Sequence, residues 1–298
     1  MKVGLISEGT NVWPLYVARS LRLFEREGIA VEVTVTGSSV EQQAQLIAGG
    51  FDVGFQQADH VVRAVQQGSD LFIFMPLGHA PDLTLVAAPS IHSLAKLRGK
   101  TVGVDGARTG YALLLRRLLR EQGLAEHEVT FREVGGSRER YDALKSGEIA
   151  ASLLNSPFDT NLIAGGYVAL ARTSDAFPSY PGPVMAARRS WAKVHERELL
   201  AFIRAFEAAY AWLEDAAHAS EAFSVLPPHL AIAPAEASAA FDRFRARGRP
   251  SLTAEGLQQV IDTYWAAAGL ETAKPSPERY MDLSYIKRTR EEGDRHTG

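Results

Sequence analysis

The sequence predicts an α/β protein of two lobes, each built on a mostly parallel sheet flanked by helices, with a helical C-terminal segment. The chain has 298 residues, 46% of them hydrophobic, and so exceeds the ~100–200 residues of a usual single domain. Residues 3–187 alternate short β-type runs with helix-type segments, whereas residues 189–298 show almost only helical spacing. Strand–helix alternation of this kind builds parallel sheets joined by right-handed crossovers.

The first region, residues 1–84, contains expected strands at Val3–Ile6, Ala30–Thr36, Phe51–Phe55 and Leu71–Pro76. The last of these, LFIFMP, is apolar without interruption, which favours burial on both faces of a parallel sheet. Apolar residues at helical spacing predict the segments between the strands to be helices. These helices span residues 13–26, 38–48 and 59–66.

The second region, residues 85–188, repeats the same alternation. Its expected strands span 83–87, 101–104, 129–134, 150–154 and 168–171, and its expected helices span 111–122, 138–146 and 158–164. A last strand is expected at Val184–Ala187. Beyond it the pattern predicts helices at 196–214, 216–224, 234–244 and 253–268. The last ten residues, TREEGDRHTG, are polar and terminal, and we expect them to fray.

Composition excludes several functional classes. The formal net charge is −3 and the pI about 6.3, so the chain lacks the concentrated basic charge of a nucleic-acid-binding domain. It has no cysteine, which excludes disulfides, thiolate metal sites, iron–sulfur clusters and cysteine nucleophiles. No metalloprotease, Walker or dinucleotide-binding motif is present, so neither a metal nor a cofactor is expected.

The N-terminus bears on localisation. Met1-Lys2 runs directly into an expected strand, without the apolar stretch of a secretory leader, and no other stretch reaches the ~18 apolar residues of a membrane span. We therefore expect no membrane insertion. The protein is expected to be cytoplasmic if Met1 is the native start, and periplasmic or otherwise extracytoplasmic if a leader has been removed.

Ligands of parallel α/β sheets sit at the carboxyl ends of strands, where helix N-termini present free N–H groups. This rule selects the loops at residues 7–13, 56–60, 105–111 and 155–158, and a further loop, 174–182, lies beside the last expected strand. The candidate ligand-binding residues in these loops are Asn11, Trp13, Gln56, Gln57, Arg108, Thr109, Gly110, Tyr111, Asn155, Ser156 and Tyr180.

The loop DGARTGY at residues 105–111 carries the sharpest pattern. Thr109 has a hydroxyl to donate, Gly110 loosens the turn, and the backbone N–H groups that precede Tyr111 would attract an anion. Arg108 would add a guanidinium that binds an oxyanion with two hydrogen bonds. The alternative for Arg108 is a solvated loop arginine.

Several of the other candidates also have a structural alternative. Trp13 would stack on a flat ligand, or would pack on the start of a helix. Gln56 and Gln57 would read polar groups of a ligand with their amides, and the neighbouring Asp59 would interact with the helix dipole. Asn11 lies in the same loop as Trp13.

In the second region, Asn155 and Ser156 precede a proline at a helix start, which suits both helix capping and ligand binding. Tyr180 lies in the proline-rich stretch FPSYPGP and would close over a ligand, or the prolines would only rigidify the turn. His60 and His79 are the histidines near plausible cleft positions. Isolated histidines of this kind are more often structural than catalytic.

Four segments carry a resemblance to a known group. They are PLYVA at 14–18 with FEREGI at 24–29, AGGFDVG at 48–54, SLAKLRGKTVGV at 93–104, and ALKSGEIAA at 143–151, where Ala150 replaces a usual acidic residue. Over residues 1–190 the chain resembles the substrate-binding proteins of the sulfonate, taurine, nitrate and thiamine-precursor transport group. That resemblance implies the two-lobed type II periplasmic-binding-protein fold.

The resemblance also implies boundaries and a function. The first lobe would comprise residues 1–84 and 189–298, and the second 85–188, with hinge crossings near Val86–Ala88 and Pro183–Arg188 and a ligand cleft between the lobes. A monomer of this group would capture a small carboxylate, sulfonate or heteroaromatic solute by hinge closure and deliver it to an ABC permease.

Two other functions stay open at this point. The first is a cytoplasmic enzyme on the same scaffold, decarboxylase- or lyase-like, that uses His60 or His79 with Asp59 as acid–base groups on a small aromatic or carboxylic substrate. The related thiamine-pyrimidine synthases need a cysteine-rich motif, and this chain has no cysteine. The second is a regulatory ligand-binding domain, although no helix-turn-helix segment is evident.

Overall fold

The computed structural model describes residues 1–81, 83–107, 109–155, 158–230 and 234–296. The chain forms two compact units. The first comprises Met1–His79, Pro181–Leu257 and Pro275–Gly298, and the second comprises Ala80–Tyr180 and Gln258–Lys274.

These units differ from the expected lobes at the crossings. The expected crossing near Val86–Ala88 coincides with a strand inside the second unit, and Pro183–Arg188 is a strand inside the first. The chain instead changes unit between His79 and Ala80 and between Tyr180 and Pro181. Gln258–Lys274, which we expected in the first lobe, belongs to the second unit. Helical periodicity identified this segment as a helix and a turn but carries no information about which sheet it covers.

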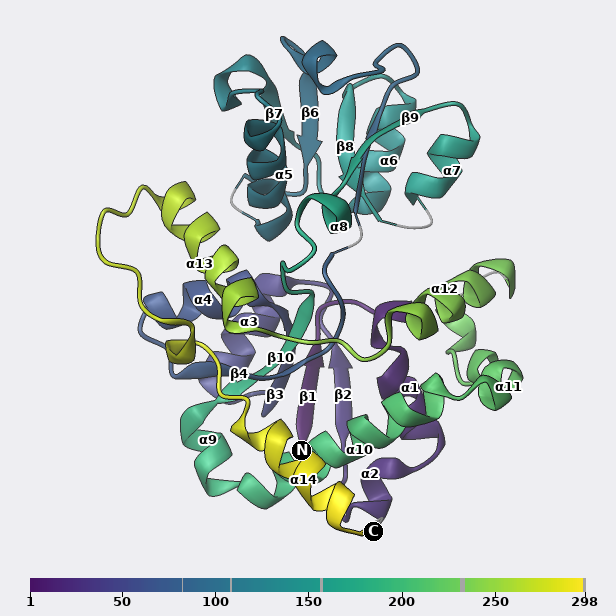
Figure 1. Ribbon diagram of the computed structural model, residues 1–298, viewed down its shortest axis with the longest axis vertical. Coiled ribbons are helices and arrows are strands. Elements are labelled where there is room, and N and C mark those ends of the chain that lie inside the picture. Colours follow the sequence, from purple (N-terminus) through teal and green to yellow (C-terminus); the bar gives the residue numbers. More distant parts are fainter. Residues whose placement is uncertain (82, 108, 156–157, 231–233, 297–298) are drawn as a thin grey trace. The chain divides into compact units, whose positions relative to one another are not determined.

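The first unit contains a five-stranded sheet of order β2-β1-β3-β10-β4 (Figure 1). Its strands are β1 (Lys2–Leu5), β2 (Glu32–Val35), β3 (Val53–Gln57), β4 (Leu71–Pro76) and β10 (Pro183–Arg188). β1 pairs in parallel with β2 and β3, whereas β10 runs antiparallel to β3 and β4. The mostly parallel sheet predicted from the strand–helix alternation is confirmed, and only the strand that follows the second crossing is reversed.

The second unit repeats this plan with the order β7-β6-β8-β5-β9. Its strands are β5 (Thr84–Ala87), β6 (Thr101–Val104), β7 (Thr130–Glu133), β8 (Ala151–Leu154) and β9 (Val168–Arg172). β6 pairs in parallel with β7 and β8, and β5 runs antiparallel to β8 and β9. As in the first unit, the reversed strand is the one that follows a crossing.

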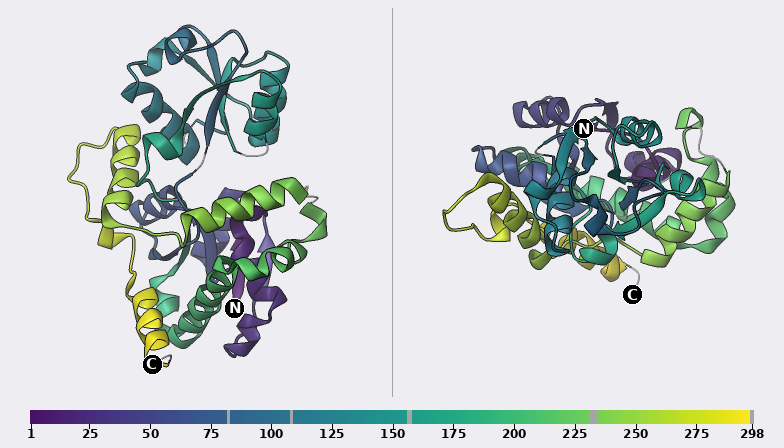
Figure 2. Two further views of the ribbon diagram at one scale, coloured as in Figure 1. Left: turned by 45° about the vertical axis from the view of Figure 1, so that its right-hand side comes forward. Right: turned by 90° about the horizontal axis from the view of Figure 1, so that it is seen from above.

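Helices cover both faces of each sheet, as the two views of Figure 2 show. Those that lie wholly in the first unit are α1 (Trp13–Ser20), α2 (Leu23–Arg26), α3 (Ser39–Ala48), α4 (Ala58–Gln66), α9 (Arg189–Val194), α10 (Glu196–Glu214), α11 (Ala219–Ser224), α12 (Pro234–Arg247) and α14 (Ser284–His296). The second unit has α5 (Gly110–Glu121), α6 (Ser137–Lys145), α7 (Phe158–Ala164) and α8 (Thr173–Ala176). α13 (Ala254–Ala268) begins in the first unit and continues in the second.

The core of the first unit is built on α10. Phe202, Phe206 and Tyr210 recur every four residues, so they share one helix face, and each is at most 1% exposed. Phe206 meets Phe24 of α2 and Phe55 of β3 with ring centroids 6.0 and 5.8 Å apart. Burial of each such aromatic stabilises the fold by about 1.5–3 kcal/mol. This cluster therefore joins the helical C-terminal part of the chain to the N-terminal sheet.

The end of the chain is fastened to the same unit. The backbone N–H of Ile73 in β4 donates to the Tyr280 carbonyl at 2.8 Å, and that of Asp282 donates to the Ile73 carbonyl at 2.9 Å. The segment thereby covers the free edge of β4. The expectation of a frayed tail is wrong for Thr289, which is 5% exposed in α14, and for Arg290, which pairs with Glu207. Both residues lie in α14, which packs on α10.

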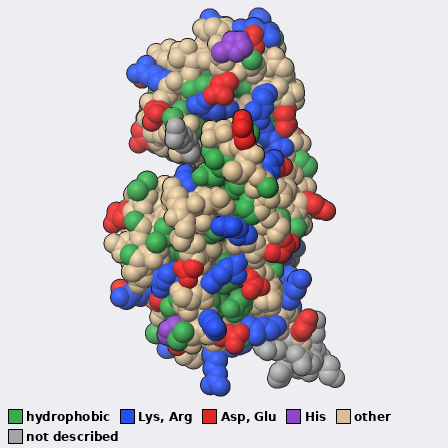
Figure 3. Space-filling view, turned by 90° about the vertical axis from the view of Figure 1, so that its left-hand side faces the viewer, with side chains coloured by type: hydrophobic (Ala, Val, Ile, Leu, Met, Phe, Trp, Pro, Cys, Tyr) green, Lys and Arg blue, Asp and Glu red, His purple; other side chains and the backbone are tan. Residues whose placement is uncertain are grey.

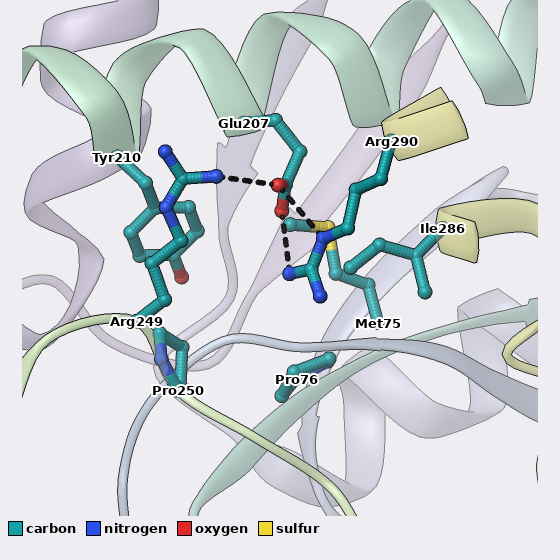
Figure 4. Close-up of a pocket in the computed structure, with 8 residues that line it drawn as sticks. All are labelled: Met75, Pro76, Glu207, Tyr210, Arg249, Pro250, Ile286 and Arg290. Carbon is teal, nitrogen blue, oxygen red and sulfur yellow. Dashed lines mark hydrogen bonds and ion pairs between the residues drawn. The ribbon is translucent and has the colours of Figure 1, made fainter. Parts of the chain in front are cut away.

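An ion-pair cluster holds α14 and the segment after α12 on α10 (Figure 4). The Glu207 carboxylate lies 2.8 Å from Arg249 Nη1, 3.1 Å from Arg290 Nε and 3.2 Å from Arg290 Nη2. Arg249 Nε also lies 3.1 Å from each of the two carboxylate oxygens of Glu214. The space between Met75 and the side chains of Glu207, Arg249 and Arg290 is filled and has no room for a water-sized molecule. We therefore interpret the cluster as structural.

The surface carries charges of both signs. On the face drawn in Figure 3, Lys and Arg side chains lie among Asp and Glu side chains, the pattern expected for a chain with a net charge of −3. Across the described part of the chain, none of the helices has the length and apolar character that a membrane crossing requires.

Acidification is expected to destabilise the first unit through His79. Its Nε2 lies 2.9 Å from the Gly248 carbonyl oxygen. Burial lowers the pKa of the imidazole; the hydrogen bond to Gly248 opposes this shift and the charge of Arg247 adds to it. The unfolded chain therefore takes up this proton near pH ~6.5, where the folded protein does not. The contribution of His79 is intact above that pH and is lost as the pH falls through the folded-state pKa, at no more than ~1.4 kcal/mol per pH unit.

The measurement is urea unfolding of wild type and His79→Gln between about pH 7 and 5. The glutamine keeps a donor for the Gly248 carbonyl but does not titrate, so its free energy of unfolding should fall less steeply on acidification. His127, which is exposed, gives the matched control His127→Gln. Equal slopes for wild type and His79→Gln would contradict the prediction.

Candidate functional site

The carboxyl edge of the first sheet places two predicted residues where a solute could reach them. β1 and β3 run in parallel, so the segments that follow them leave at the same edge. Asn11 lies in the 3₁₀ turn Thr10–Val12 after β1 and is exposed. Gln57 ends β3 as the residue before α4 and is half-buried, and its side chain does not cap the helix.

Trp13 lies in the interior of the first unit. It is 1% exposed, and its indole N–H donates to the Ala222 carbonyl at 2.9 Å. Its ring packs against Phe223 and Phe241, with centroids 6.1 and 5.8 Å away. The packing alternative describes this side chain, because α11 and α12 occupy the face that would have stacked on a ligand. We leave Trp13 out of the ligand contacts proposed below.

Gln56 is 1% exposed and belongs to a buried chain of amides. Gln42 of α3 donates to the carbonyls of Gly4 and Phe55, so its own oxygen must accept, and Gln56 donates to it. Gln56 is thus directed between β3 and α3. Its Oε1 is buried and accepts no hydrogen bond within the described part of the chain. We leave Gln56 out of the proposed contacts as well.

Sequence reasoning missed His229, the partner of Glu8 at this edge. Glu8, in the loop after β1, accepts a hydrogen bond from the Tyr16 hydroxyl at 3.3 Å and lies 2.7 Å from His229 Nε2. Burial and the neighbouring Glu8 carboxylate raise the pKa of Tyr16 to about 12, so it stays a neutral donor. His229 is 221 positions from Glu8 in the chain, and no local pattern links the two.

The carboxyl edge of the second sheet holds the predicted loop after β6. The Thr109 hydroxyl donates to Asp105 Oδ1 at 2.5 Å and accepts from the Ala112 N–H at 3.3 Å, which caps α5. Its proton is therefore directed at Asp105. Gly110 is the first residue of α5, and Tyr111 follows it, half-buried. Arg108 lies outside the described residues.

Two further candidates lie in the same unit. Asn155 follows β8, is exposed, and accepts the backbone N–H of Phe158 at 3.0 Å with its carbonyl. Tyr180, the last residue before the second crossing, is 7% exposed, and its ring centroid lies 6.5 Å from that of Phe177. Ser156 lies outside the described residues.

The histidines of the enzyme alternative occupy structural positions. His79 is bound to the Gly248 carbonyl. His60 is 8% exposed in the first turn of α4, with its Nε2 4.0 Å from Asp59 Oδ2. In the described residues no cluster of three or more His, Asp or Glu side chains is arranged to hold a metal ion.

A buried arginine is the second residue that sequence reasoning missed. Arg140 of α6 is 3% exposed. Its guanidinium donates to the carbonyls of Gly135 and Leu153, at 2.6 and 3.3 Å, and to Ser137 Oγ at 3.2 Å. Gly135 follows β7, and Leu153 lies in β8. Arg140 thus joins the ends of two parallel strands at the edge that carries the loop after β6.

Comparison with protein families agrees with this architecture. The family model described as NMT1/THI5 like matches residues 9–219, more than two thirds of the chain. The chain belongs to the NMT1/THI5-like family. A comparison with curated proteins finds no match. The predicted resemblance to this group of substrate-binding proteins is confirmed at the level of the family.

Solved structures extend the comparison to the whole chain. A protein of Bordetella bronchiseptica RB50 is 21% identical, with a TM-score of 0.79, and the match covers 98% of this chain and 97% of that one. The alkanesulfonate-binding protein SsuA of Xanthomonas axonopodis pv. citri, solved with MOPS, is 18% identical, with a TM-score of 0.73 over 95% and 98% of the two chains. The periplasmic nitrate-binding protein NrtA of Synechocystis PCC 6803 is 13% identical, with a TM-score of 0.73 over 98% and 88%.

These similarities confirm the predicted periplasmic-binding-protein fold for the NMT1/THI5-like chain. Each unit supplies one sheet whose parallel strands end at an edge with polar loops, which is where α/β proteins bind ligands. No dehydrogenase, hydrolase or phosphate-loop motif accompanies those loops in the sequence.

Proposed function

We propose that this protein is the solute-binding component of an ABC importer. The observation that carries the proposal is the family match over residues 9–219 together with structural similarity over nearly the whole chain to binding proteins of sulfonate and nitrate. The protein acts as a monomer, outside the cytoplasmic membrane, and passes its solute to a permease. No bond is made or broken.

The mechanism is a population shift. The solute first binds to one unit, and the connecting segments at His79–Ala80 and Tyr180–Pro181 then allow the two units to close on it. A solute shifts this equilibrium only by the difference between its affinities for the two states. Contacts with both units therefore set the affinity.

The proposed contacts follow from the positions described above. In the first unit they are Asn11 and Gln57. In the second they are Gly110, Tyr111, Asn155 and Tyr180, with Arg108 and Ser156 retained as predictions from the sequence. Thr109 contributes by capping α5 and by holding the loop before it, because its hydroxyl proton is directed at Asp105. The solute is a small organic molecule with a carboxylate, sulfonate or heteroaromatic group.

A thermal-shift screen tests the function. The purified protein is heated with alkanesulfonates, taurine, nitrate, aromatic carboxylates and pyrimidines, and every stabilising compound is analysed by mass spectrometry after incubation. A solute present at 100 times its Kd stabilises the folded state by about 2.7 kcal/mol, enough to shift the melting temperature by several degrees. We expect at least one compound that stabilises the protein and is recovered unchanged.

Variants in both units identify the site. Asn11→Ala and Tyr111→Phe should weaken binding of the hit while leaving the melting temperature of the free protein within about 2 °C, because Asn11 is exposed and Tyr111 is half-buried. The exposed Val40→Ala serves as the control. A hit that is recovered chemically altered would overturn the binding-protein proposal in favour of an enzyme. The absence of any stabilising solute would also contradict the binding-protein proposal.

A further inference from the structure

Arg140 is a buried positive charge without an ion-pair partner among the residues that the structure describes. It is 3% exposed, and in the described part of the chain its hydrogen bonds go to two carbonyl oxygens and one hydroxyl, all uncharged. A buried charge is costly unless a group of opposite sign compensates it. A carboxylate in place of one of these uncharged acceptors would compensate the charge, but no described carboxylate lies within 4.0 Å of the guanidinium.

The acidic groups nearby compensate this charge only at longer range. Burial lowers the pKa of Arg140, and the charges of Asp105, Tyr111 and Glu139 act in the opposite direction. Asp105 is held by the Thr109 hydroxyl at 2.5 Å. Glu139 is the exposed neighbour of Arg140 on α6. An arginine stays protonated in proteins at neutral pH even in such a position, so the charge persists.

The position of this charge connects it with the proposed site. Its hydrogen-bond acceptors are the carbonyl that follows β7 and a carbonyl of β8, and between those strands in the sheet lies β6, whose loop leads to α5. The N-terminus of α6 at Gly136 has no side-chain cap, so no side chain offsets its partial positive charge. The Arg140 guanidinium lies beside this helix end, because it donates to the Gly135 carbonyl. A buried positive charge therefore lies beneath this edge of the second sheet.

We infer that Arg140 determines the charge preference of the solute site, favouring a solute with an anionic group through its buried charge rather than through direct contact. This inference rests on the proposed function. The anionic group of the solute supplies the close counter-charge that Arg140 lacks among the described residues. Arg140 is therefore a specificity-determining residue that also holds the ends of β7 and β8 in position.

The experiment compares two probes of nearly the same size, one of which is charged and the other uncharged. They are 1-propanesulfonate and the uncharged 1-propanesulfonamide, titrated calorimetrically into wild type, Arg140→Met, Arg140→Lys and Arg138→Met. Arg138 lies on the same helix, has a side chain that is 70% exposed, and pairs with Asp142. Arg138→Met thus changes the net charge by the same amount and controls for long-range effects.

The expected result is specific to the charged probe. Wild type should prefer the sulfonate, and Arg140→Met should weaken sulfonate binding at least tenfold, about 1.4 kcal/mol, while sulfonamide binding changes less than about twofold. Arg140→Lys should retain most of the preference because it keeps the charge. Arg138→Met should bind both probes like wild type, since charges exposed to solvent are screened.

Other outcomes overturn the inference. Equal losses for both probes in Arg140→Met would make the residue purely structural, and an unchanged preference would exclude its charge from recognition. If Arg140→Met does not fold, Arg140→Lys decides, because loss of the preference in a folded variant that keeps the charge would contradict the inference. A wild type that binds an uncharged compound of the thermal-shift screen but not the sulfonate would leave the solute-binding function standing and reject the role of Arg140. Absence of any binding in that screen rejects the function itself.

Discussion

Replacing Gly182 with alanine is expected to destabilise the first unit by about 3 kcal/mol or more. A Cβ at this position would fall on the carbonyl oxygen of His79 and would lie 2.5 Å from the carbonyl oxygen of Gly78. Both contacts are with backbone atoms, so no side chain can rotate away. The alanine is therefore accommodated only if the segments before the first crossing and after the second move apart.

Several hydrogen bonds oppose that movement. The N–H groups of Leu77 and Gly78 donate to the Pro183 carbonyl at 2.8 and 3.1 Å, and the Tyr210 hydroxyl donates to the Leu77 carbonyl at 2.7 Å. Burial raises the pKa of Tyr210 far above its ordinary range, so this donor stays neutral. Separation of the segments would leave these buried groups unpaired, at ~1–3 kcal/mol each.

The measurement is urea unfolding monitored by circular dichroism. Gly78→Ala is the matched control, because its Cβ would meet only the Pro183 ring, with Cδ at 3.1 Å and Cγ at 3.4 Å, and should cost under about 1 kcal/mol. If Gly182→Ala unfolds at the same urea concentration as Gly78→Ala, the tight backbone contact at the crossings does not exist in solution.

The second large effect is expected for Trp13→Ala, which should lower the free energy of unfolding by about 3–5 kcal/mol. The substitution leaves a cavity where the indole packs on Phe223 and Phe241 and removes the donor to the Ala222 carbonyl. Trp13→Phe keeps most of the packing and should cost less. Val40→Ala, at a side chain that is 77% exposed, should stay within about 0.5 kcal/mol of wild type.

The same variants decide between packing and stacking for Trp13. If the side chain only packs, Trp13→Phe binds the solute found by the thermal-shift screen with wild-type affinity. A loss of binding in Trp13→Phe that exceeds its loss of stability would restore the residue to the ligand site. Calorimetric titration of the folded variant measures this separately from unfolding.

Much of each sheet could be predicted because the signals are local. Alternation in AVEVTVT and the apolar run LFIFMP correspond to β2 and β4, and Thr109 before Gly110 marks the start of α5. The motifs AGGFDVG and ALKSGEIAA identified the family correctly. Each of these patterns depends on neighbours in the chain, through backbone preference, side-chain period or capping.

The candidate site could be predicted only in outline. The rule for strand ends selected loops that do lie at the carboxyl edges of their sheets, such as those of Asn11 and Thr109. It could not tell which side chains of a loop face inward, and so it included Trp13 and Gln56, which are both 1% exposed. The direction of a side chain depends on the helices that cover the sheet, and these come from distant parts of the chain.

The sequence by itself determined the strand–helix alternation, the family and the exclusion of cysteine chemistry, because these follow from residue type and spacing. Only the tertiary structure decided that Trp13 packs against a segment 209 residues away, that His229 meets Glu8, and that Arg140 lies buried between two strand ends. Such contacts arise when elements with no local relation pack to bury apolar surface, and polar groups then pair with whatever lies beside them. Their partners are therefore set by the fold and not by position in the chain.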